Sequence, residues 1–234
     1  MIKITSFGSG SSGNCYLIDD GSSQLLIECG VRFELVKQKM RFNLSKVAGM
    51  LITHEHGDHS KEINKVLKTS AIEIYASKGT IDALKVPSFR SNTMKNKVPY
   101  KIGTWTVTPF DIKHDVTEPF GFLIDNQVGE RLLFLTDTKY SEYYFEGITH
   151  MMVEANYSIE SLVQRMQSGQ VVASLKSRVM QSHFEFENTK SFIKANMSEK
   201  LQEVWLIHLS DGNSDEAQFK RDIQALTGVP VYIA

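Results

Sequence analysis

The sequence predicts an α/β protein built as a four-layer αββα sandwich, with two sheets and helices outside them. Expected strands come first along the chain, helices follow, and the same order then occurs again. The run 47–52 is apolar on both faces, as expected of a strand buried inside such a sandwich. The length of 234 residues, with 41% hydrophobic and 23% charged residues, suits a single domain, 1–234, with a buried core.

The elements of the first part rest on turn residues and periodicity. Strands are expected at 3–7, 15–18, 24–27, 47–52 and 72–75, and helices at 32–42, 59–67 and 78–84. Phe33, Val36 and Met40 recur at helical spacing, which supports the helix 32–42. The stretch 85–101 lacks a clear period, and we expect it to be irregular.

The second part repeats the order of strands and then helices. Strands are expected at 104–110, 120–125, 131–135, 151–154, 203–207 and 230–233, and helices at 158–167, 187–195 and 214–226. A turn around Val128 and Gly129 separates two of these strands.

Composition restricts the compartment and the class of ligand. The formal net charge of -1 argues against a strongly basic nucleic-acid binder, although it leaves room for a local basic patch. The two cysteines, Cys15 and Cys29, cannot build a disulfide framework and suit a reducing compartment. We see neither a signal peptide nor an apolar run of membrane-spanning length, so we expect a cytoplasmic protein without a membrane partner.

The strongest functional signal is the string Thr53-His54-Glu55-His56-Gly57-Asp58-His59, directly after the expected buried strand. Imidazole nitrogens and carboxylate oxygens are ligands that divalent metal ions prefer. A turn leaving a strand can direct His54 and His56 to one point. Asp58 and His59, at the start of a helix, can point to a second. The spacing therefore predicts two neighbouring metal ions, and the alternative is a set of structural polar residues.

This string resembles the signature of the metallo-β-lactamase superfamily, and the resemblance implies that superfamily's αββα fold. Three later segments follow the superfamily's order of motifs, namely Lys113-His114-Asp115, Leu135-Thr136-Asp137 and Ile207-His208-Leu209. By resemblance, His114 completes the first metal site, Asp137 bridges both ions and His208 is the last ligand. The implied ions are zinc or manganese. Without the resemblance, each residue could be an ordinary loop, capping or core residue.

The resemblance also implies catalytic residues. Glu154 and His183 match a glutamate–histidine pair of ribonuclease Z and the small nucleases. His183 would donate a proton to the leaving oxygen or stabilise the transition state, and Glu154 would orient its ring. Asp58 would accept the proton of the attacking water. Glu28 stands where aspartate is usual and would brace the ligand loop rather than bind metal, and the alternative is a solvated loop acid.

The resemblance covers nearly the whole chain within the compact WalJ/YycJ-like branch, bacterial and phage proteins regarded as exonuclease-like. It rests on residues 8–15, His114-Asp115 with Pro119 and Gly121, Glu154-Ala155-Asn156, Ser174-Leu175-Lys176 and Ile207-His208-Leu209-Ser210. Tyr157 departs from the branch, where histidine is usual, and this difference leaves the choice of substrate open.

Two such metal ions could form a metal-bound hydroxide that attacks an ester, an amide or a phosphodiester. Two-zinc β-lactamases have a cysteine at the position of Asp137, and both cysteines here precede residue 30, so phosphodiesters are favoured. We expect a dinuclear-metal phosphodiesterase, a nuclease that cleaves DNA or RNA. The alternatives are a phosphodiesterase for small or cyclic nucleotides and a non-catalytic or redox metal-binding module. A homodimer is one assembly that the sequence leaves open.

The segment 85–101 is the candidate nucleic-acid track. It contains basic residues and no acidic one, with Phe89 and Tyr100 available to stack on bases. Lys95 and Lys97 are its expected substrate-binding residues. The alternative is a solvated basic loop.

Overall fold

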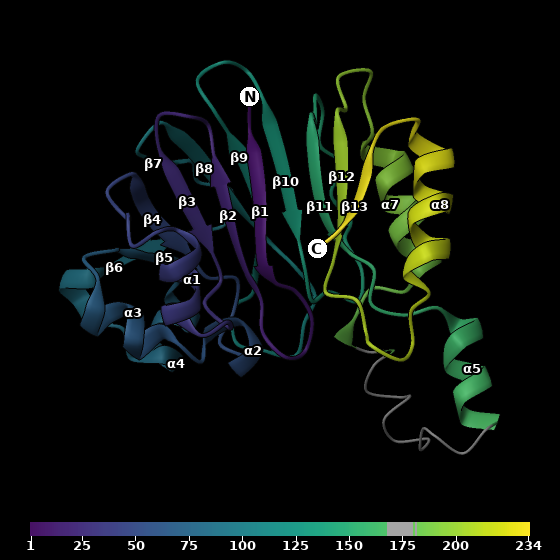
Figure 1. Cartoon of the computed structure of the whole chain (residues 1–234), viewed down its shortest axis with the longest axis horizontal. Coiled ribbons are helices and arrows are strands. Elements are labelled where there is room, and N and C mark those ends of the chain that lie inside the picture. The colour runs from purple at the N-terminus through teal and green to yellow at the C-terminus, as the bar shows by residue number, and fades with distance from the viewer. Residues whose placement is uncertain (168–179, 181) are drawn as a thin grey trace. The chain divides into compact units, whose positions relative to one another are not determined.

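The computed structural model describes residues 1–167, 180 and 182–234 (Figure 1). Contacts between Cα atoms divide the chain into two compact units. The first unit is Met1–Asp111 with Val116–Glu130, and the second is Ile112–Asp115 with Arg131–Ala234. The segment Ser174-Leu175-Lys176, on which part of the resemblance rests, lies outside the described residues.

A six-stranded sheet organises the first unit, with its strands in chain order. The strands are β1 (Lys3–Gly8), β2 (Cys15–Asp19), β3 (Gln24–Ile27), β4 (Val47–Leu51), β5 (Ile74–Ser77) and β6 (Ser91–Met94). β1 to β3 pair antiparallel, whereas β3 to β6 pair parallel. The carboxyl ends of β3 to β6 therefore lie at the same end of the sheet, and the histidine string leaves β4 there.

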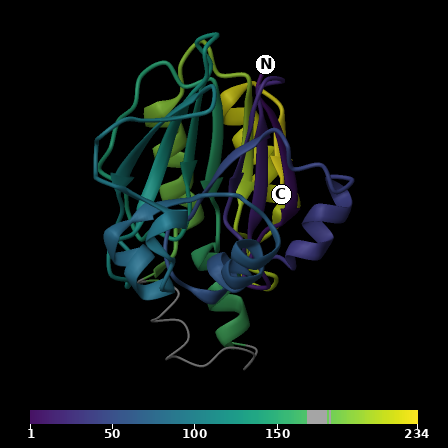
Figure 2. The same cartoon turned by 90° about the vertical axis from the view of Figure 1, so that its left-hand side faces the viewer.

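Three helices cover one face of this sheet, namely α1 (Phe33–Lys39), α3 (Ile63–Thr69) and α4 (Lys78–Leu84). Their apolar residues join those of the strands in one buried cluster, in which Phe33 and Val66 pack with Met50. Figure 2 shows the first unit from the side of these blue helices.

The expected helix 59–67 is wrong in one respect, because the chain forms two helices there. α2 (Gly57–Ser60) ends before α3 begins. The carbonyl of Asp58 accepts the N–H of Asn14 at 2.8 Å, and the N–H of Glu62 donates to the carbonyl of Cys29 at 3.0 Å. Neighbouring segments therefore take the hydrogen bonds that would have continued one helix.

The stretch 85–101 is more regular than expected. Ser91–Met94 forms β6, which pairs with β5, and Tyr100–Ile102 forms β7. β7 continues into an antiparallel meander with β8 (Trp105–Asp111) and β9 (Phe120–Asp125). β6 and β7 are short and contain mostly polar residues. They form strands because their backbones pair with neighbouring strands, and their sequences show no apolar alternation that could have predicted them.

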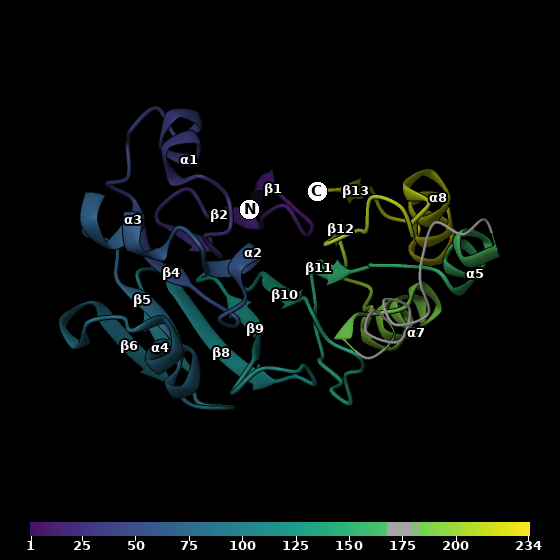
Figure 3. The same cartoon turned by 90° about the horizontal axis from the view of Figure 1, so that it is seen from below.

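The second unit is a parallel sheet covered by helices. Its strands are β10 (Arg131–Leu135), β11 (His150–Glu154), β12 (Glu203–Ile207) and β13 (Val231–Ile233), paired in this order. Its helices include α5 (Ile159–Gln167), α7 (Phe186–Asn196) and α8 (Glu216–Thr227). α7 and α8 lie side by side (Figures 1 and 3), where the rings of Phe186 and Phe219 stack with centroids 3.7 Å apart.

The parallel order of β10, β11 and β12 brings their carboxyl ends to one end of the sheet. Asp137 follows β10, Glu154 ends β11 and His208 follows β12. Three candidate residues that are far apart in the sequence therefore meet at that end. Among the described residues, no helix combines the length and apolar character needed to cross a membrane.

Candidate metal centre and acid–base pair

The first unit gathers His54, His56, Asp58 and His59, which we call the histidine cluster. The ring centroids of His54 and His56 lie 4.9 Å apart, and those of His54 and His59 lie 4.2 Å apart. Asp58 Oδ2 is 3.3 Å from His59 Nε2. His54 and His59 are fully buried. Closely packed imidazoles with a carboxylate are a donor set that suits a divalent metal ion.

Glu28 supports this cluster through contacts with Thr53 and His59. It lies fully buried at the end of β3, so the alternative of a solvated loop acid is wrong. Its Oε1 accepts the hydroxyl of Thr53 at 2.5 Å, and that hydroxyl lies 2.8 Å from His54 Nδ1. The same Oε1 is 3.5 Å from His59 Nδ1. Burial raises the pKa of Glu28, although hydrogen bonds and attraction from His59 and Thr53 oppose this rise.

Asn14 holds the other side of His59, and sequence reasoning assigned it no role. Its Nδ2 lies 3.3 Å from His59 Nε2 and donates to the carbonyl of Asp58 at 3.3 Å. The backbones approach closely here, because a Cβ on Gly30 would lie 1.6 Å from the carbonyl oxygen of Asp58. Gly13, the last residue of the glycine-rich turn before Asn14, is also crowded, because a Cβ there would lie 2.2 Å from the carbonyl oxygen of Gly30. That turn is the feature of the sequence that could have indicated a close approach.

The second unit gathers Asp137, Glu154, His183 and His208, which we call the carboxylate–histidine cluster. One ligand atom from each residue lies within 4.8 Å of every other. Asp137, Glu154 and His208 are buried, whereas the His183 side chain is 22% exposed. His114, also in this unit, places Nε2 at 3.7 Å from Asp137 Oδ2. The cluster therefore combines metal-binding donors with one histidine that solvent or substrate can reach.

Glu154 is the central residue of this cluster. Its Oε1 lies 2.7 Å from His183 Nδ1, and its Oε2 accepts the N–H groups of Thr138 at 3.1 Å and Phe184 at 3.2 Å. Burial alone would lower the pKa of His183, but the charge and hydrogen bond of Glu154 raise it. Burial would raise the pKa of Glu154, but His183 lowers it. Each member of the pair therefore stabilises the charged form of the other.

Asn156 supports His208, and it too received no role from the sequence. Its Nδ2 donates to the His208 carbonyl at 2.8 Å and lies 3.1 Å from His208 Nδ1. His208 Nδ1 is also 3.4 Å from both Asp137 Oδ1 and Glu154 Oε1. Asn156 stands two residues after β11, beside the end of β12, so parallel pairing of the strands brings the two side chains together.

Three of these residues have backbone angles in the left-handed region. The φ values are 68° at Glu28, 46° at Asp137 and 53° at His208. Residues with a Cβ rarely adopt this conformation, and such strain concentrates at functional sites. Each of the three follows the end of a strand. The sharp turn there changes the direction of the chain directly at the candidate residue.

The basic segment divides into structural and exposed residues. The guanidinium of Arg90 donates to the carbonyls of Leu67 and Ile72, so it stabilises the fold. The Tyr100 hydroxyl accepts the N–H of Lys95 at 2.9 Å. The side chains of Lys95, Lys97 and Phe89 are exposed. Lys95 and Lys97 lie between β6 and β7, and the N–H of Lys97 donates to the carbonyl of Pro109 in β8 at 2.8 Å.

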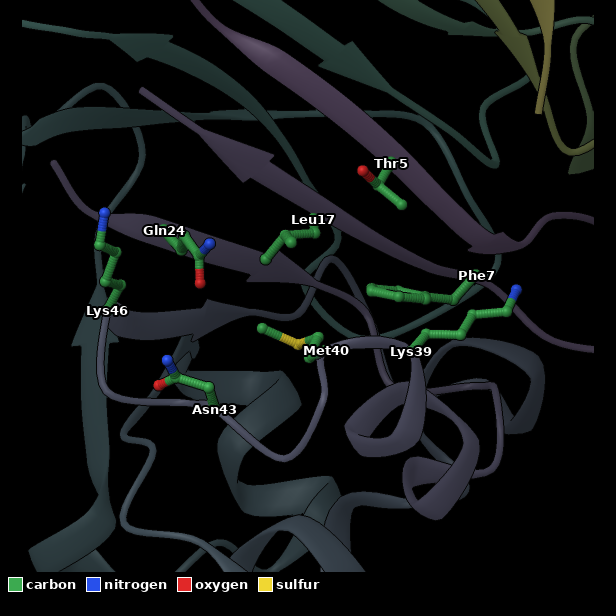
Figure 4. Close-up of a pocket in the computed structure, with 8 residues that line it drawn as sticks. All are labelled: Thr5, Phe7, Leu17, Gln24, Lys39, Met40, Asn43 and Lys46. Atoms are coloured by element: carbon green, nitrogen blue, oxygen red, sulfur yellow. The ribbon is translucent and has the colours of Figure 1, made fainter. Parts of the chain in front are cut away.

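Each unit also contains a surface cavity. The first unit's cavity, of about 250 Å³, lies between β1 to β3 and the segment after α1 (Figure 4). Phe7, Leu17 and Met40 line it, together with the side chains of Lys39 and Lys46. Lys46 donates to the carbonyl of Gly21 at 2.8 Å, and Lys39 lies over the Phe7 ring.

The sequence matches the family model described as beta-lactamase superfamily domain over residues 23–203. The chain belongs to this superfamily. It is 25% identical to exodeoxyribonuclease YycJ of Bacillus anthracis over 92% of this chain and 85% of the relative. It is 24% identical to exodeoxyribonuclease WalJ of Streptococcus pneumoniae over 91% of this chain and 83% of the relative. The expected resemblance to the WalJ/YycJ branch is therefore confirmed.

Solved structures of other proteins show the same fold. The metallo-β-lactamase fold protein YhfI of Bacillus subtilis superposes with a TM-score of 0.76 at 16% identity, covering 100% of this chain and 97% of that one. Zn²⁺-bound PqqB of Methylobacterium extorquens gives 0.74 at 12% identity, with 100% and 97% covered. The predicted α/β class, with two sheets flanked by helices, is confirmed. The chain is thus a metallo-hydrolase-fold protein with residues able to bind divalent metal.

Proposed function

We propose that this superfamily member is a metal-dependent phosphodiesterase that cleaves phosphodiester bonds of DNA or RNA. The observation that carries the proposal is the Glu154–His183 pair, which lies against Asp137 and His208. A buried carboxylate that holds a partly exposed imidazole suits proton transfer to a leaving alkoxide. The relatives named exodeoxyribonuclease add support for a nuclease.

The donor chemistry of both clusters fits divalent zinc or manganese, because each combines imidazole nitrogens with carboxylate oxygens. From the superfamily's order of motifs, we assign His54, His56 and His114 to one ion. Asp58, His59 and His208 would hold the other, and Asp137 would contribute to both. When bound, two such ions acidify a water molecule and stabilise negative charge on phosphate oxygens.

The protein's own residues then handle protons and orientation. Asp58 accepts the proton of the attacking water. His183 donates a proton from Nε2 to the leaving oxygen, because Glu154 holds its Nδ1. The N–H groups of Thr138 and Phe184 hold the other oxygen of Glu154 in place. Because the carboxylate cannot turn, it keeps the His183 ring in one orientation.

Lys95 and Lys97 are the proposed phosphate contacts of a longer substrate, since their exposed ammonium groups stand in a segment without acidic residues. The compartment we propose is the cytoplasm, because Cys15 and Cys29 are buried free thiols, which suits a reducing environment.

The second candidate is a phosphodiesterase for small or cyclic nucleotides, which the net charge of -1 favours. Purified protein loaded with zinc or with manganese separates the two. The panel is bis(p-nitrophenyl) phosphate, single-stranded and double-stranded DNA, RNA and cyclic mononucleotides. The nuclease predicts cleavage of a polymer. Hydrolysis of cyclic mononucleotides with none of DNA or RNA supports the second candidate, and no hydrolysis of any phosphodiester contradicts both.

A further inference from the structure

The second unit has a cavity of about 260 Å³, and Phe184, the residue after His183, is one of its lining residues. The segment 140–144 forms one wall with three tyrosines, and α7 forms the other. Phe184 and Phe192 line it as well, and they are buried with ring centroids 5.9 Å apart. Tyr140 and Tyr144 are 54% and 66% exposed, so their rings stand at the opening. The cavity therefore offers aromatic surface to a ligand that enters from solvent.

One carboxylate connects this cavity with the proposed reaction centre. Glu154 Oε2 accepts the N–H of Phe184 in the cavity and the N–H of Thr138, while Oε1 holds His183. The Thr138 hydroxyl in turn donates to the carbonyl of Tyr140 at 2.9 Å. Phe184 is the next residue after His183, so their Cα atoms are about 4 Å apart. Phe184 therefore links the wall of the cavity directly to the Glu154–His183 pair.

The tyrosine segment is also held at its other end. Asn196 Oδ1 accepts the N–H of Phe145 at 2.7 Å, and Asn196 Nδ2 donates to the carbonyl of Phe192 at 2.9 Å. Asn196 is buried in the last turn of α7. Both ends of the segment are therefore tied to elements of the same unit, and the cavity is preformed.

The lining chemistry indicates a flat, neutral ligand with polar edges. Among the described residues that line the cavity there is no lysine or arginine, and the one charged residue is Glu142. The carboxylate would repel a phosphate but can accept a hydrogen bond from an exocyclic amine or ring N–H. Asn188 adds an amide on the rim of α7. The first unit's cavity (Figure 4) differs in charge, because its lining residues include Lys39 and Lys46.

We propose that this cavity binds the unpaired base of the nucleotide next to the scissile phosphate, with Tyr140 and Tyr144 stacking on it. The inference rests on the proposed function and names its substrate class, a single-stranded end or segment. Aromatic stacking on bases tolerates different sequences, because every base has a π-face. A base paired in a duplex cannot enter, so double-stranded substrate must first unpair at its end.

The test compares two substrates of the zinc- or manganese-loaded protein, a short oligothymidylate and bis(p-nitrophenyl) phosphate, which has no base. For Tyr140→Ala and Tyr144→Ala, the ratio of kcat/KM on the first to that on the second should fall roughly 5- to 100-fold. Tyr140→Phe and Tyr144→Phe should retain the ratio, since stacking needs only the ring. Tyr232→Ala, an exposed tyrosine of β13, is the matched control and should also retain it. An unchanged ratio in both alanine variants would overturn the proposal.

A base-free oligomer of the same length sharpens the result. For wild-type protein, kcat/KM on the base-free oligomer should be lower than kcat/KM on oligothymidylate, by the same factor that the Tyr144→Ala substitution costs on oligothymidylate. For Tyr144→Ala, kcat/KM on the two oligomers should be nearly equal. Equal discrimination by the two proteins contradicts the proposal.

A binding measurement separates the pocket from the proposed activity. In Tyr144→Trp, oligothymidylate should quench the new tryptophan fluorescence more strongly than the base-free oligomer, whether or not turnover occurs. Equal quenching overturns the pocket. A wild-type protein that hydrolyses no phosphodiester but shows this selective quenching contradicts the proposed function and not the base site.

Discussion

The histidine cluster and the carboxylate–histidine cluster use similar donors but are assembled in different ways. In the first, one turn after β4 and the short α2 place four residues together within the string 54–59. In the second, Asp137, Glu154 and His208 come from three parallel strands that end at the same end of the sheet, and His183 precedes α7. A local turn thus builds one cluster, and sheet topology builds the other.

This difference affects how each cluster responds to change. The members of the histidine cluster share one backbone segment, which Glu28 and Asn14 brace. The members of the carboxylate–histidine cluster share a buried carboxylate, Glu154, which contacts two separate segments. A substitution in either cluster can act on metal binding or on proton transfer, according to the residue. In the first cluster Asp58 has the proposed proton-transfer role, and in the second the Glu154–His183 pair has it.

The largest effect is expected from Asp137→Ala, because Asp137 is the proposed shared ligand. Bound metal should fall from two equivalents toward one or none, and phosphodiesterase activity should fall below detection. Elemental analysis of purified protein gives the metal content, with circular dichroism to verify folding. His54→Ala, which removes a ligand of one ion, should retain the second ion. Two full equivalents in folded Asp137→Ala would contradict the bridging role.

The next effect concerns His183. His183→Ala should lower kcat roughly 10²–10⁴-fold on a substrate with a poor leaving group, because general acid catalysis has this magnitude. Its metal content should equal that of wild type. A substrate with a good leaving group, such as bis(p-nitrophenyl) phosphate, needs less protonation and serves as the internal control. If metal is lost together with activity, His183 is a ligand and the two clusters are more alike than proposed.

A smaller effect is expected from the two asparagines, one beside each cluster. Asn14→Ala removes contacts to His59 and Asp58, and Asn156→Ala removes contacts to His208. Each should weaken metal affinity roughly 10- to 100-fold, as is typical of residues that orient ligands. Competition with a chelator measures this affinity. Unchanged affinity in both variants would show that the clusters do not depend on these contacts.

The smallest effect is expected from the basic segment. The double variant Lys95→Ala, Lys97→Ala should cleave DNA or RNA several-fold less efficiently and show a flatter dependence on salt, because fewer counterions are released. Hydrolysis of bis(p-nitrophenyl) phosphate should remain near that of wild type. A double variant of the exposed Lys68 and Lys200 is the matched control. Identical polymer cleavage across a salt series would remove Lys95 and Lys97 from the substrate path.

Sequence reasoning succeeded where a pattern is local. The run 47–52 and the string after it predicted a strand followed by clustered histidines, and the first unit contains both, while metal binding by these histidines stays a prediction. Most elements lie within a few residues of their expected ranges, as with β12, which spans Glu203–Ile207. These features depend on periodicity and on residues adjacent in the chain, which the sequence displays directly. The order of motifs also identified the superfamily.

Only the tertiary structure decided the features that depend on distant hydrogen bonds. The N–H of Asn14 bonds to the carbonyl of Asp58 and the N–H of Glu62 bonds to the carbonyl of Cys29, and these two bonds interrupt the expected helix 59–67. Backbone pairing likewise forms strands in the stretch 85–101. Glu28 is buried although its sequence context also suited a solvated acid. The cavity beside Phe184 forms because Glu154 and Asn196 hold a tyrosine segment against α7. Single residues carry too little local signal for such contacts, since their partners are chosen by how the strands and helices pack.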